Sequence, residues 1–207
     1  MNVIVIAKEP VPGRVKTRLC PPCSNDQAAA IAEAALADTL QAVSTADAGR
    51  PVLVLDGSPG RWVPPGLRVV PQRGRGLDER LAAAFEDVGG PALLIGMDTP
   101  QVHPAMLAGA TAFLLGDGVD AVLGDAADGG WWAIGLRRAD RRVFDGVAMS
   151  TSGTARAQLS RLAALGLRVA RLPVLRDVDT WGDALAVAEL APGSRFAAEV
   201  GRMRVPA

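Results

Sequence analysis

Four cations in one short segment are the residues whose spacing first indicates chemistry. Lys8, Arg14, Lys16 and Arg18 fall within eleven residues, and prolines and Gly13 interrupt the segment. Such a loop binds oxyanions, phosphate above all, through its side chains and backbone N–H groups. It lacks the Gly-Lys pair of a Walker loop and is therefore a loop of another kind. The predicted phosphate-binding residues in it are Lys8, Gly13, Arg14, Lys16, Thr17 and Arg18.

The distribution of lysine supports this prediction. Lys8 and Lys16 are the only two lysines of the chain, and the other twenty basic residues are arginines. Lysine provides a compact charge where the planar guanidinium of arginine does not fit. These two positions therefore favour a bound phosphate. The alternative is a solvated surface loop that holds its lysines by chance.

Carboxylates in two other segments suggest a metal site. Asp98 lies in the segment directly after one apolar run, and Asp177 and Asp179 follow a later run. Mg²⁺ takes one or two carboxylates together with phosphate oxygens. We therefore predict that Asp98 shares a divalent cation, Mg²⁺ or Mn²⁺, with Asp177, Asp179 or both. Lys16 is predicted to border the same cleft and, with Asp98, to be catalytic.

Each of these carboxylates also has a structural alternative. The segment Asp-Thr-Pro is typical of a turn that caps a helix, which would explain Asp98 without a metal. One of Asp177 and Asp179 would likewise serve as the cap of the helix that begins near Thr180. The positions of the carboxylates relative to Lys16 decide between these alternatives.

Three further segments are candidates for substrate contacts. Asp125 and the run from Asp128 to Trp132 form a polar loop that ends in two indoles. The loop would hold a substrate against an aromatic face; alternatively, one indole lies in the core and the other at an edge. Arg75, in Arg-Gly-Arg-Gly, would hold a base or a phosphate, or lie in a plain turn. Three hydroxyl residues before a predicted helix would bind a polar group or cap that helix. The predicted substrate residues are Asp128, Gly129, Gly130, Trp131, Ser150, Thr151 and Ser152.

Two other features do not favour chemistry. Cys20 and Cys23 have the C-x-x-C spacing of redox motifs but lack the surroundings of a thioredoxin fold, so two ordinary buried thiols are the favoured interpretation. His103 is the only histidine and precedes a proline at a predicted helix start, which indicates a cap. Without a second histidine or a G-x-S-x-G segment, a Ser-His-Asp hydrolase is disfavoured.

The elements that must position these residues alternate along the chain. Short, mostly β-branched apolar runs predict strands over 3–6, 52–55, 67–70, 92–95, 119–123, 131–136 and 167–172. Longer alanine-rich or periodic stretches predict helices over 24–45, 78–88, 104–115, 154–165 and 180–190. Strands separated by helices predict a three-layer α/β/α fold with a mainly parallel sheet. Such sheets bind ligands at the carboxyl ends of their strands, which is where the candidate residues fall.

Length and charge limit the classes of function. The 207 residues, with 22 basic and 22 acidic side chains and a pI near 6.6, indicate one globular domain of balanced charge. We expect this domain to span 1–191 and a C-terminal tail to span 192–207. A nucleic-acid or membrane-surface binder would carry a basic excess, and no apolar run approaches the roughly 18–20 residues that span a bilayer. With no signal peptide in view and only two cysteines, a cytoplasmic protein is predicted.

Taken in order, five motifs suggest a family. The longest is A-K-x-P-x-P-G-x-x-K-T-R-L, from Ala7 to Leu19, and the shorter ones are Gly-x-Asp-x-Pro at 96–100, Asp-Gly-Gly at 128–130, Ser-Thr-Ser at 150–152 and Asp-Val-Asp-Thr at 177–180. Together they resemble a bacterial family of GT-A-like transferases that is often labelled glycosyltransferase and associated with arsenosugar or selenium-domain gene clusters. The resemblance spans 3–190.

Three of these motifs also resemble the 2-phospho-lactate and phosphoenolpyruvate guanylyltransferases of deazaflavin cofactor synthesis. The resemblance implies the nucleotide-diphospho-sugar transferase fold, with Lys8, Lys16 and Arg18 on the nucleotide phosphates. It also implies Mg²⁺ on the aspartates predicted above to share a cation. Where the family commonly has a tyrosine after Asp-Gly-Gly, this chain has Trp131, which removes a hydroxyl.

The predicted function is nucleotidyl transfer, in which a small, phosphorylated acceptor attacks the α-phosphorus of a nucleoside triphosphate and pyrophosphate leaves. That reaction needs positioning and charge neutralisation rather than a catalytic His or Cys, and a four-cation loop suits a triphosphate. The alternative is glycosyl transfer from a nucleotide-diphosphate sugar, with Asp98 on the metal and Asp128 as base. A non-catalytic nucleotide sensor is disfavoured because Lys16 and the aspartates are all present. The predicted partners are a nucleotide and a small-molecule acceptor, not nucleic acid or a membrane.

Overall fold

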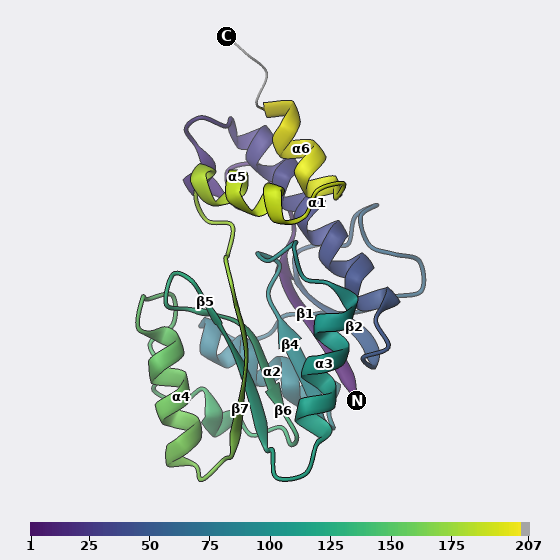
Figure 1. The fold of residues 1–207 in the computed structure, drawn as a ribbon. Helices are drawn as coiled ribbons and strands as arrows, with labels where there is room; N and C mark the ends of the chain where they lie inside the picture. The colour runs from purple at the N-terminus through teal and green to yellow at the C-terminus, as the bar shows by residue number, and fades with distance from the viewer. Residues whose placement is uncertain (204–207) are drawn as a thin grey trace.

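In the computed structural model, which describes residues 1–203, seven strands form one mixed sheet (Figure 1). The strands are β1 Asn2–Lys8, β2 Arg50–Asp56, β3 Arg68–Pro71, β4 Ala92–Ile95, β5 Ala121–Ala126, β6 Trp131–Leu136 and β7 Val169–Leu175. Their order across the sheet is β3-β2-β1-β4-β6-β5-β7. Only β6 among them runs against the common direction, because it pairs antiparallel with both β4 and β5. The predicted mainly parallel sheet is confirmed.

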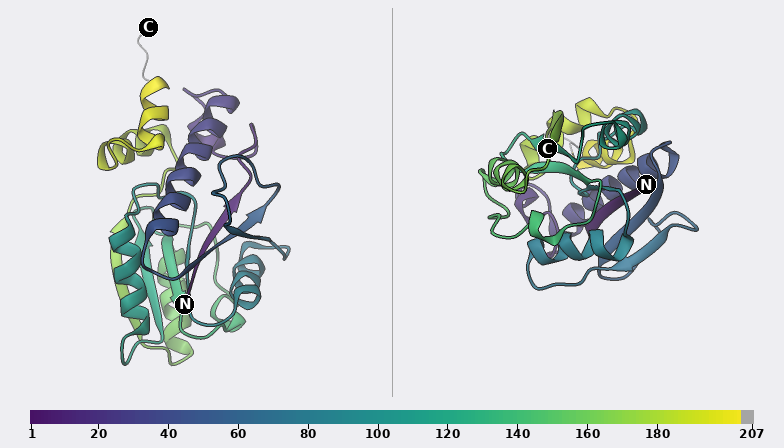
Figure 2. Two further views of the ribbon diagram at one scale, coloured as in Figure 1. Left: turned by 90° about the vertical axis from the view of Figure 1, so that its right-hand side faces the viewer. Right: turned by 90° about the horizontal axis from the view of Figure 1, so that it is seen from below.

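Helices cover both faces of this sheet, as the views from the side and from below show (Figure 2). Helices α1 and α3 pack on one face, and α2 and α4 pack on the other. The predicted three-layer α/β/α class is therefore confirmed. No helix in residues 1–203 is long and apolar enough to cross a membrane. The helices are α1 Asn25–Thr45, α2 Leu77–Val88, α3 Pro104–Leu115, α4 Thr154–Ala164, α5 Trp181–Leu190 and α6 Arg195–Met203, with short 3₁₀ turns η1 Thr17–Leu19 and η2 Arg141–Val143.

Strand β1 shows why an unbroken apolar run is suited to the centre of this sheet. Val3 and Val5 point into the cluster on the α1 and α3 side, whereas Ile4 points into the cluster on the α2 and α4 side. All three side chains are fully buried. Successive side chains of a strand point to opposite faces, so a strand covered on both faces needs apolar residues at every position.

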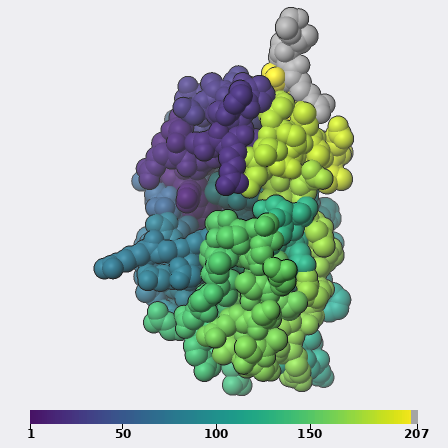
Figure 3. Space-filling view, turned by 90° about the vertical axis from the view of Figure 1, so that its left-hand side faces the viewer, coloured from purple at the N-terminus to yellow at the C-terminus, as the bar shows by residue number. Residues whose placement is uncertain are grey.

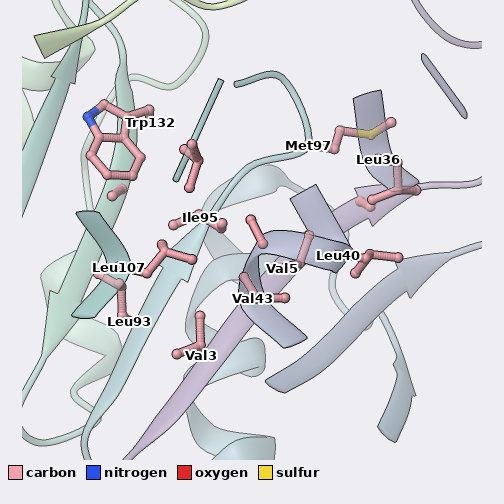
Figure 4. Close-up of a cluster of buried hydrophobic side chains, with 14 of the residues drawn as sticks. Val3, Val5, Leu36, Leu40, Val43, Leu93, Ile95, Met97, Leu107 and Trp132 are labelled. Atoms are coloured by element: carbon pink, nitrogen blue, oxygen red, sulfur yellow. The ribbon is translucent and has the colours of Figure 1, made fainter. Parts of the chain in front are cut away.

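The cluster on the α1 side extends to the carboxyl edge of the sheet (Figure 4). Leu36 and Leu40 of α1 and Leu107 of α3 belong to it, and so does Met97, which follows β4. Met97 is buried there. Because its side chain is anchored in the core, the backbone of the next residue, Asp98, is held at this edge.

A third apolar cluster lies beyond the carboxyl ends of the strands, where α5 and α6 pack against α1 (Figure 1). Leu19, from the loop after β1, and Val178, from the segment after β7, are buried in this cluster. Two segments that are far apart in the sequence are therefore fixed to the same small core, directly beside the carboxyl edge of the sheet.

Helix α6 lies in the segment that was expected to be a C-terminal tail, where the sequence analysis predicted no helix. Phe196 and Val200, one helical turn apart, are buried against the third cluster. The backbone N–H of Phe196 also donates to Oδ2 of Asp38 on α1, at 2.8 Å. These apolar contacts, four residues apart on one helix face, stabilise a helix that the composition of the segment does not predict. The last four residues of the expected tail lie outside the described residues.

Capping groups set the starts of three helices. At α1, Ser24 and Gln27 form a capping box. At α5, Thr180 and Asp183 form a second one. At α3, Nδ1 of His103 accepts a hydrogen bond from the backbone N–H two residues on, at 3.2 Å. The predicted capping role of His103 is confirmed.

Candidate functional site

A cleft of about 860 Å³ opens at the carboxyl edge of the sheet. Figure 3 shows a hollow between the N-terminal segment (purple), the region around the start of α4 (green) and the C-terminal helices (yellow). The loops after β1, β3, β4 and β7, the β5–β6 hairpin and the loop before α4 contribute its walls. All the predicted site residues except Gly13 and Gly129 line it. They are Lys8, Arg14, Lys16, Thr17, Arg18, Arg75, Asp98, Asp128, Gly130, Trp131, Ser150, Thr151, Ser152, Asp177 and Asp179.

Lys16 connects the predicted phosphate loop to the predicted metal ligands. Its Nζ lies 2.5 Å from Oδ1 of Asp98 and 3.7 Å from Oδ1 of Asp179. It also donates a hydrogen bond to the backbone carbonyl of Val178. The Lys16 side chain is only 8% exposed, and its backbone is left-handed, with a φ of 50° that is uncommon for a residue with a Cβ. One ammonium group is therefore shared by the loops after β4 and β7.

The segment after β7 reaches the centre of the cleft by crossing the edge of the sheet. Strands β6 and β5 separate β4 from β7, so adjacent strands do not bring the carboxylates together. Instead, the Val178 N–H donates to the backbone carbonyl of Asp98 at 2.9 Å. An ion pair of 3.0 Å between Arg18 and Asp179 fastens the same segment to the loop after β1. A crossing segment, and not a pair of neighbouring strands, therefore brings the carboxylates together.

The capping alternatives for the three aspartates do not apply. Helix α5 is capped by its own Thr180, and helix α3 is capped by His103. Asp177 and Asp179 both line the cleft, because residues two apart in an extended segment face the same side.

Asp177 is the least compensated carboxylate of the cleft. Within residues 1–203, its buried Oδ1 has no hydrogen-bond partner. Burial, followed by the charges of Asp98 and Asp128, raises the pKa of this carboxyl to about 7. Asp179 acts in the same direction on this pKa, and Lys16 acts against it. This part of the cleft therefore holds more negative charge than its own cations compensate.

The carboxylates are hard oxygen donors of the kind that Mg²⁺ and Mn²⁺ prefer. As they stand in residues 1–203, however, no three His, Cys, Asp or Glu side chains are grouped to hold a metal ion. The ammonium of Lys16 lies beside two of the carboxylates instead. The assignment of Asp98, Asp177 and Asp179 as metal ligands therefore stays a prediction.

Other cations of the cleft have no carboxylate partner. Lys8, Arg14 and Arg75 line it, and their side chains form no ion pair with any residue in the described range 1–203. Arg80, by contrast, is bound to Asp56 at 2.7 Å. Unpaired cations in a concave surface raise the local concentration of anions. The positive charge on this side is thus available to a ligand.

Gly129 has a structural reason to be glycine although it does not line the cleft. A Cβ atom at this position would lie 2.0 Å from the carbonyl oxygen of Ser152, and its φ is +93°. The Gly129 carbonyl also accepts a hydrogen bond of 2.9 Å from the N–H of Ala155. The buried Thr154 donates through Oγ1 to the carbonyl of Ala148, at 2.9 Å. These contacts hold the loop before α4, with its three hydroxyl residues, against the β5–β6 hairpin.

The two tryptophans of the hairpin take different positions. Trp132 is buried in the core, and its Nε1 donates to the carbonyl of Pro173 at 2.9 Å. Trp131 is half-buried and lines the cleft. Asp125, in contrast, is paired with Arg171 on the next strand and does not line the cleft. Trp131 alone of the pair contributes an indole to the cleft wall.

Among the lining residues that were not predicted from the sequence, Asp56, Gln72 and Arg80 form one polar network. Arg80 donates to Oε1 of Gln72 at 3.2 Å, and Nε2 of Gln72 donates to the carbonyl of Ala7 at 2.7 Å. With the Arg80–Asp56 pair, this network ties together the carboxyl ends of β1, β2 and β3. A signal existed only for Asp56, which follows the apolar run of β2 as Asp98 follows that of β4.

Gly13 and the two cysteines lie outside the cleft lining. Gly13 has a φ of +75°, so it serves the turn of the loop rather than contact with a ligand. Cys20 and Cys23 are free thiols, one half-buried and one buried. Burial, and secondarily the nearby Cys20, raises the pKa of the Cys23 thiol above its ordinary value.

The sheet order and the cleft at its carboxyl edge define a fold class, that of nucleotide-diphospho-sugar transferases and nucleotidyltransferases. A protein of Desulfovibrio desulfuricans G20 that carries the provisional name nucleotide-diphospho-sugar transferase is similar to this chain. The two share 26% identity, with a TM-score of 0.85 over 97% of this chain and 94% of that one. CMP:2-keto-3-deoxy-manno-octonic acid synthetase, in a complex with CTP, shares 12% identity, with a TM-score of 0.58 over 91% and 99% of the chains. The name of the first of these neighbours is that of a transferase, the class of enzyme that the sequence predicted for this chain.

Within this class, the chain belongs to a family described as an uncharacterized protein conserved in bacteria (DUF2064), whose model matches residues 29–151. The loop after β1 and the segment after β7 lie outside the matched residues. A further similar structure, Rv0371C of Mycobacterium tuberculosis, is a complex with manganese; it shares 21% identity, with a TM-score of 0.50 over 91% of this chain and 98% of that one. No curated protein matches the chain.

Proposed function

We propose that the protein is a metal-dependent nucleotidyltransferase, which joins a nucleoside triphosphate to a small, phosphorylated acceptor and releases pyrophosphate. One observation carries this proposal: a single cleft is lined both by cations that have no carboxylate partner in residues 1–203 and by carboxylates that its cations do not fully neutralise. A nucleoside triphosphate with its divalent cation presents the complementary charges. The CTP complex of the neighbouring synthetase is consistent with such a ligand.

In this proposal, the phosphates of the nucleotide bind beside the cations of the cleft. Lys8, Arg14 and Arg75 are free to form charge-assisted hydrogen bonds with phosphate oxygens. Their number suits a triphosphate better than the two phosphates of a sugar donor. Arg18 and Lys16 add further positive charge, which their carboxylate partners partly neutralise.

The carboxylates fit a divalent cation. The buried Oδ1 of Asp177 has no partner in residues 1–203 and therefore offers an oxygen ligand. We assign Asp98, Asp177 and Asp179 as the residues that would hold Mg²⁺ or Mn²⁺. When bound, such a cation neutralises phosphate charge and helps to orient the phosphates. The manganese complex of a structural neighbour supports this choice.

The residues of the chain account for the rest of the reaction by positioning. An oxygen of the acceptor attacks the α-phosphorus, and the bond from that phosphorus to the bridging oxygen of the leaving pyrophosphate breaks. Lys8 and Arg14 stabilise the charge that develops on the phosphates. Trp131 and the hydroxyls of the loop before α4 form the wall against which we place the acceptor. No side chain of the chain needs to form a covalent intermediate.

Glycosyl transfer from a nucleotide-diphosphate sugar is the second candidate. The provisional name of the protein from Desulfovibrio desulfuricans, at 26% identity, favours it. In that reaction Asp128, which lines the cleft, would be the base. One Oδ of Asp128 already accepts a hydrogen bond of 2.8 Å from the N–H of Gly130, which assigns the carboxylate a turn-forming role as well.

The two candidates differ in the bond that is broken, so product analysis separates them. Each of the four nucleoside triphosphates is incubated with Mg²⁺ and a panel of small phosphorylated acceptors, and pyrophosphate is measured. Nucleotide sugars are tested in parallel for release of the nucleoside diphosphate. Acceptor-dependent pyrophosphate release is the expected result. Consumption of nucleotide sugars with no use of triphosphates would establish glycosyl transfer instead. A cytoplasmic location remains a prediction of the sequence.

A further inference from the structure

The only two lysines of the chain have opposite surroundings in the same cleft. Nζ of Lys16 contacts Asp98, Asp179 and the carbonyl of Val178, and its side chain is nearly buried. Lys8 is exposed and, within residues 1–203, has no ion pair. From the sequence, both lysines were predicted to bind phosphate. Of the two lysines, only Lys8 can bind a phosphate without first losing an existing contact of its ammonium group.

The acidic cluster is only partly neutralised by its own cations. Four carboxylates interact in this region, those of Asp98, Asp128, Asp177 and Asp179. The cations bonded to them are Lys16 and Arg18. When all four carboxylates are ionised, two negative charges are therefore left over, which is the charge of one divalent cation.

We propose that Lys16 is the resident counter-ion of this cluster and that a divalent cation must displace its ammonium when the nucleotide binds, an inference that rests on the proposed function. The ammonium lies 2.5 Å from Oδ1 of Asp98, one of the carboxylates that would hold the cation. Two cations so close to one carboxylate oxygen repel each other strongly at low dielectric. Lys16 and the metal ion therefore compete for Asp98.

The displaced ammonium has a new partner at hand. Lys16 lines the same cleft as Lys8 and Arg14, the cations assigned to the phosphates. A lysine side chain carries its charge on a flexible four-carbon stem, so its ammonium can exchange one set of oxygen acceptors for another. The triphosphate supplies acceptors that the empty cleft does not. Metal alone is thus held weakly, and metal with the triphosphate is held tightly.

Two binding titrations test this exchange with probes that need no knowledge of the base or the acceptor. Mn²⁺ alone is titrated while free Mn²⁺ is followed by electron paramagnetic resonance. Inorganic tripolyphosphate alone is titrated by calorimetry in metal-free buffer. Both are performed on the wild type, on Lys16→Met and on the matched control Lys8→Met, after thermal melts have shown that each variant is folded. If Lys16→Met does not fold, Lys16→Gln takes its place, because its amide can still donate to the carbonyl of Val178.

The expected results for the two lysines are opposite. Lys16→Met raises the affinity for Mn²⁺ alone by about tenfold, which corresponds to the loss of one competing charge-assisted contact. Lys8→Met changes this affinity by less than about twofold, because Lys8 has no carboxylate partner to release. For tripolyphosphate without metal, Lys8→Met lowers the affinity by about tenfold. Lys16→Met changes it by less than about threefold, because Lys16 is already occupied.

An unchanged or lowered Mn²⁺ affinity in Lys16→Met overturns the counter-ion role. If the wild type then still binds tripolyphosphate, and binds Mn²⁺ in the presence of a nucleotide, only this inference fails and the proposed function stands. If neither probe binds to the wild type or to either variant, and nucleotide does not restore Mn²⁺ binding, the proposed function fails together with the inference.

Discussion

The cleft has two halves that are built in different ways. Its cations come mainly from one continuous segment, the end of β1 and the loop that follows it, and Lys8 and Arg14 in that segment have no carboxylate partners in residues 1–203. Its carboxylates come from separate segments after β4, β5 and β7, and burial, followed by the charges of Asp98 and Asp128, raises the pKa of Asp177 to about 7. One half is local and open, and the other is assembled from distant segments and under electrostatic stress.

This difference indicates which half controls binding. The open half attracts an anionic ligand without rearrangement. The crowded half is held together by Lys16 and by the backbone bond between Val178 and Asp98, so its charges become available only when that contact is exchanged. We therefore expect substitutions in the acidic half to affect catalysis most, and substitutions in the cationic half to affect nucleotide affinity.

The largest effect is expected at the acidic centre. Asp98→Asn should lower metal-dependent turnover by about 10²–10³-fold, because it removes one of the carboxylate charges that would hold the metal ion. The melting temperature should change by only a few degrees, since the half-exposed carboxylate contributes on the order of 1 kcal/mol to its ion pair. Turnover and thermal melts are measured on the same preparation. Unfolding with unaltered activity per folded molecule would make Asp98 a structural residue only.

A second substitution tests whether the hairpin positions the acceptor wall. Gly129→Ala should destabilise the protein by about 2–3 kcal/mol, because the new Cβ would meet the Ser152 carbonyl at a position with positive φ. Gly146→Ala is a suitable control, because its φ is also positive (+75°) but no atom lies within 4 Å of its Cβ position. Urea unfolding measures both. Equal losses of stability in the two variants would show that strain alone, and not contact with the loop before α4, fixes Gly129.

The raised pKa of Asp177 predicts that the stability of the metal-free protein depends on pH. The pKa of this carboxyl is about 7 in the folded state and 3.8 ordinarily, so between these values the folded state keeps a proton that the unfolded state has lost. Stability from this group is therefore greatest at low pH and falls as the pH rises toward 7. The free energy of unfolding of Asp177→Asn minus that of the wild type should grow by on the order of 2 kcal/mol between about pH 4.5 and 7.5. A difference that stays constant over this range would contradict the raised pKa of Asp177 in the folded protein.

The smallest effect concerns the open half and compares two arginines in one turn. Arg75 lines the cleft without a carboxylate partner in the described chain, whereas Arg73 is bound to Asp87 at 2.7 Å. Arg75→Gln should weaken the binding of a triphosphate by about fivefold, and Arg73→Gln should leave it unchanged. Calorimetric titration compares them at one ionic strength. Equal losses in the two variants would indicate a general surface effect instead of a binding role for Arg75.

The same contrast explains what the sequence could predict. The elements of the sheet and the loop after β1 were predicted because their signals are local: unbroken apolar runs such as Val3–Ile6 and a cluster of cations within eleven residues. Helix α6 was missed because it is stabilised by burial of Phe196 and Val200 against α1, a contact that composition does not reveal.

The acidic half was predicted in its residues but not in its construction. Asp98 and Asp179 were predicted to share one cation, but the sequence does not show how they meet: two strands separate β4 from β7, and a crossing segment brings them together. Such a crossing depends on tertiary packing of Val178, which carries no signal in the sequence. The contact of Lys16 with the carboxylates, instead of with an open cleft, was missed for the same reason.

The most direct test of the central claim, that the two halves form one site for a triphosphate and its metal, is a coupled binding measurement. Each α,β-methylene nucleoside triphosphate analogue, which resists transfer, is titrated in the presence and absence of Mn²⁺, and Mn²⁺ is titrated with and without the analogue. At least one analogue should strengthen the binding of Mn²⁺ by about tenfold or more. Because coupling between two ligands is reciprocal, Mn²⁺ should strengthen the binding of that analogue by the same factor. Asp98→Asn should abolish this coupling. Independent binding of the two ligands, or coupling that survives Asp98→Asn, would contradict the account.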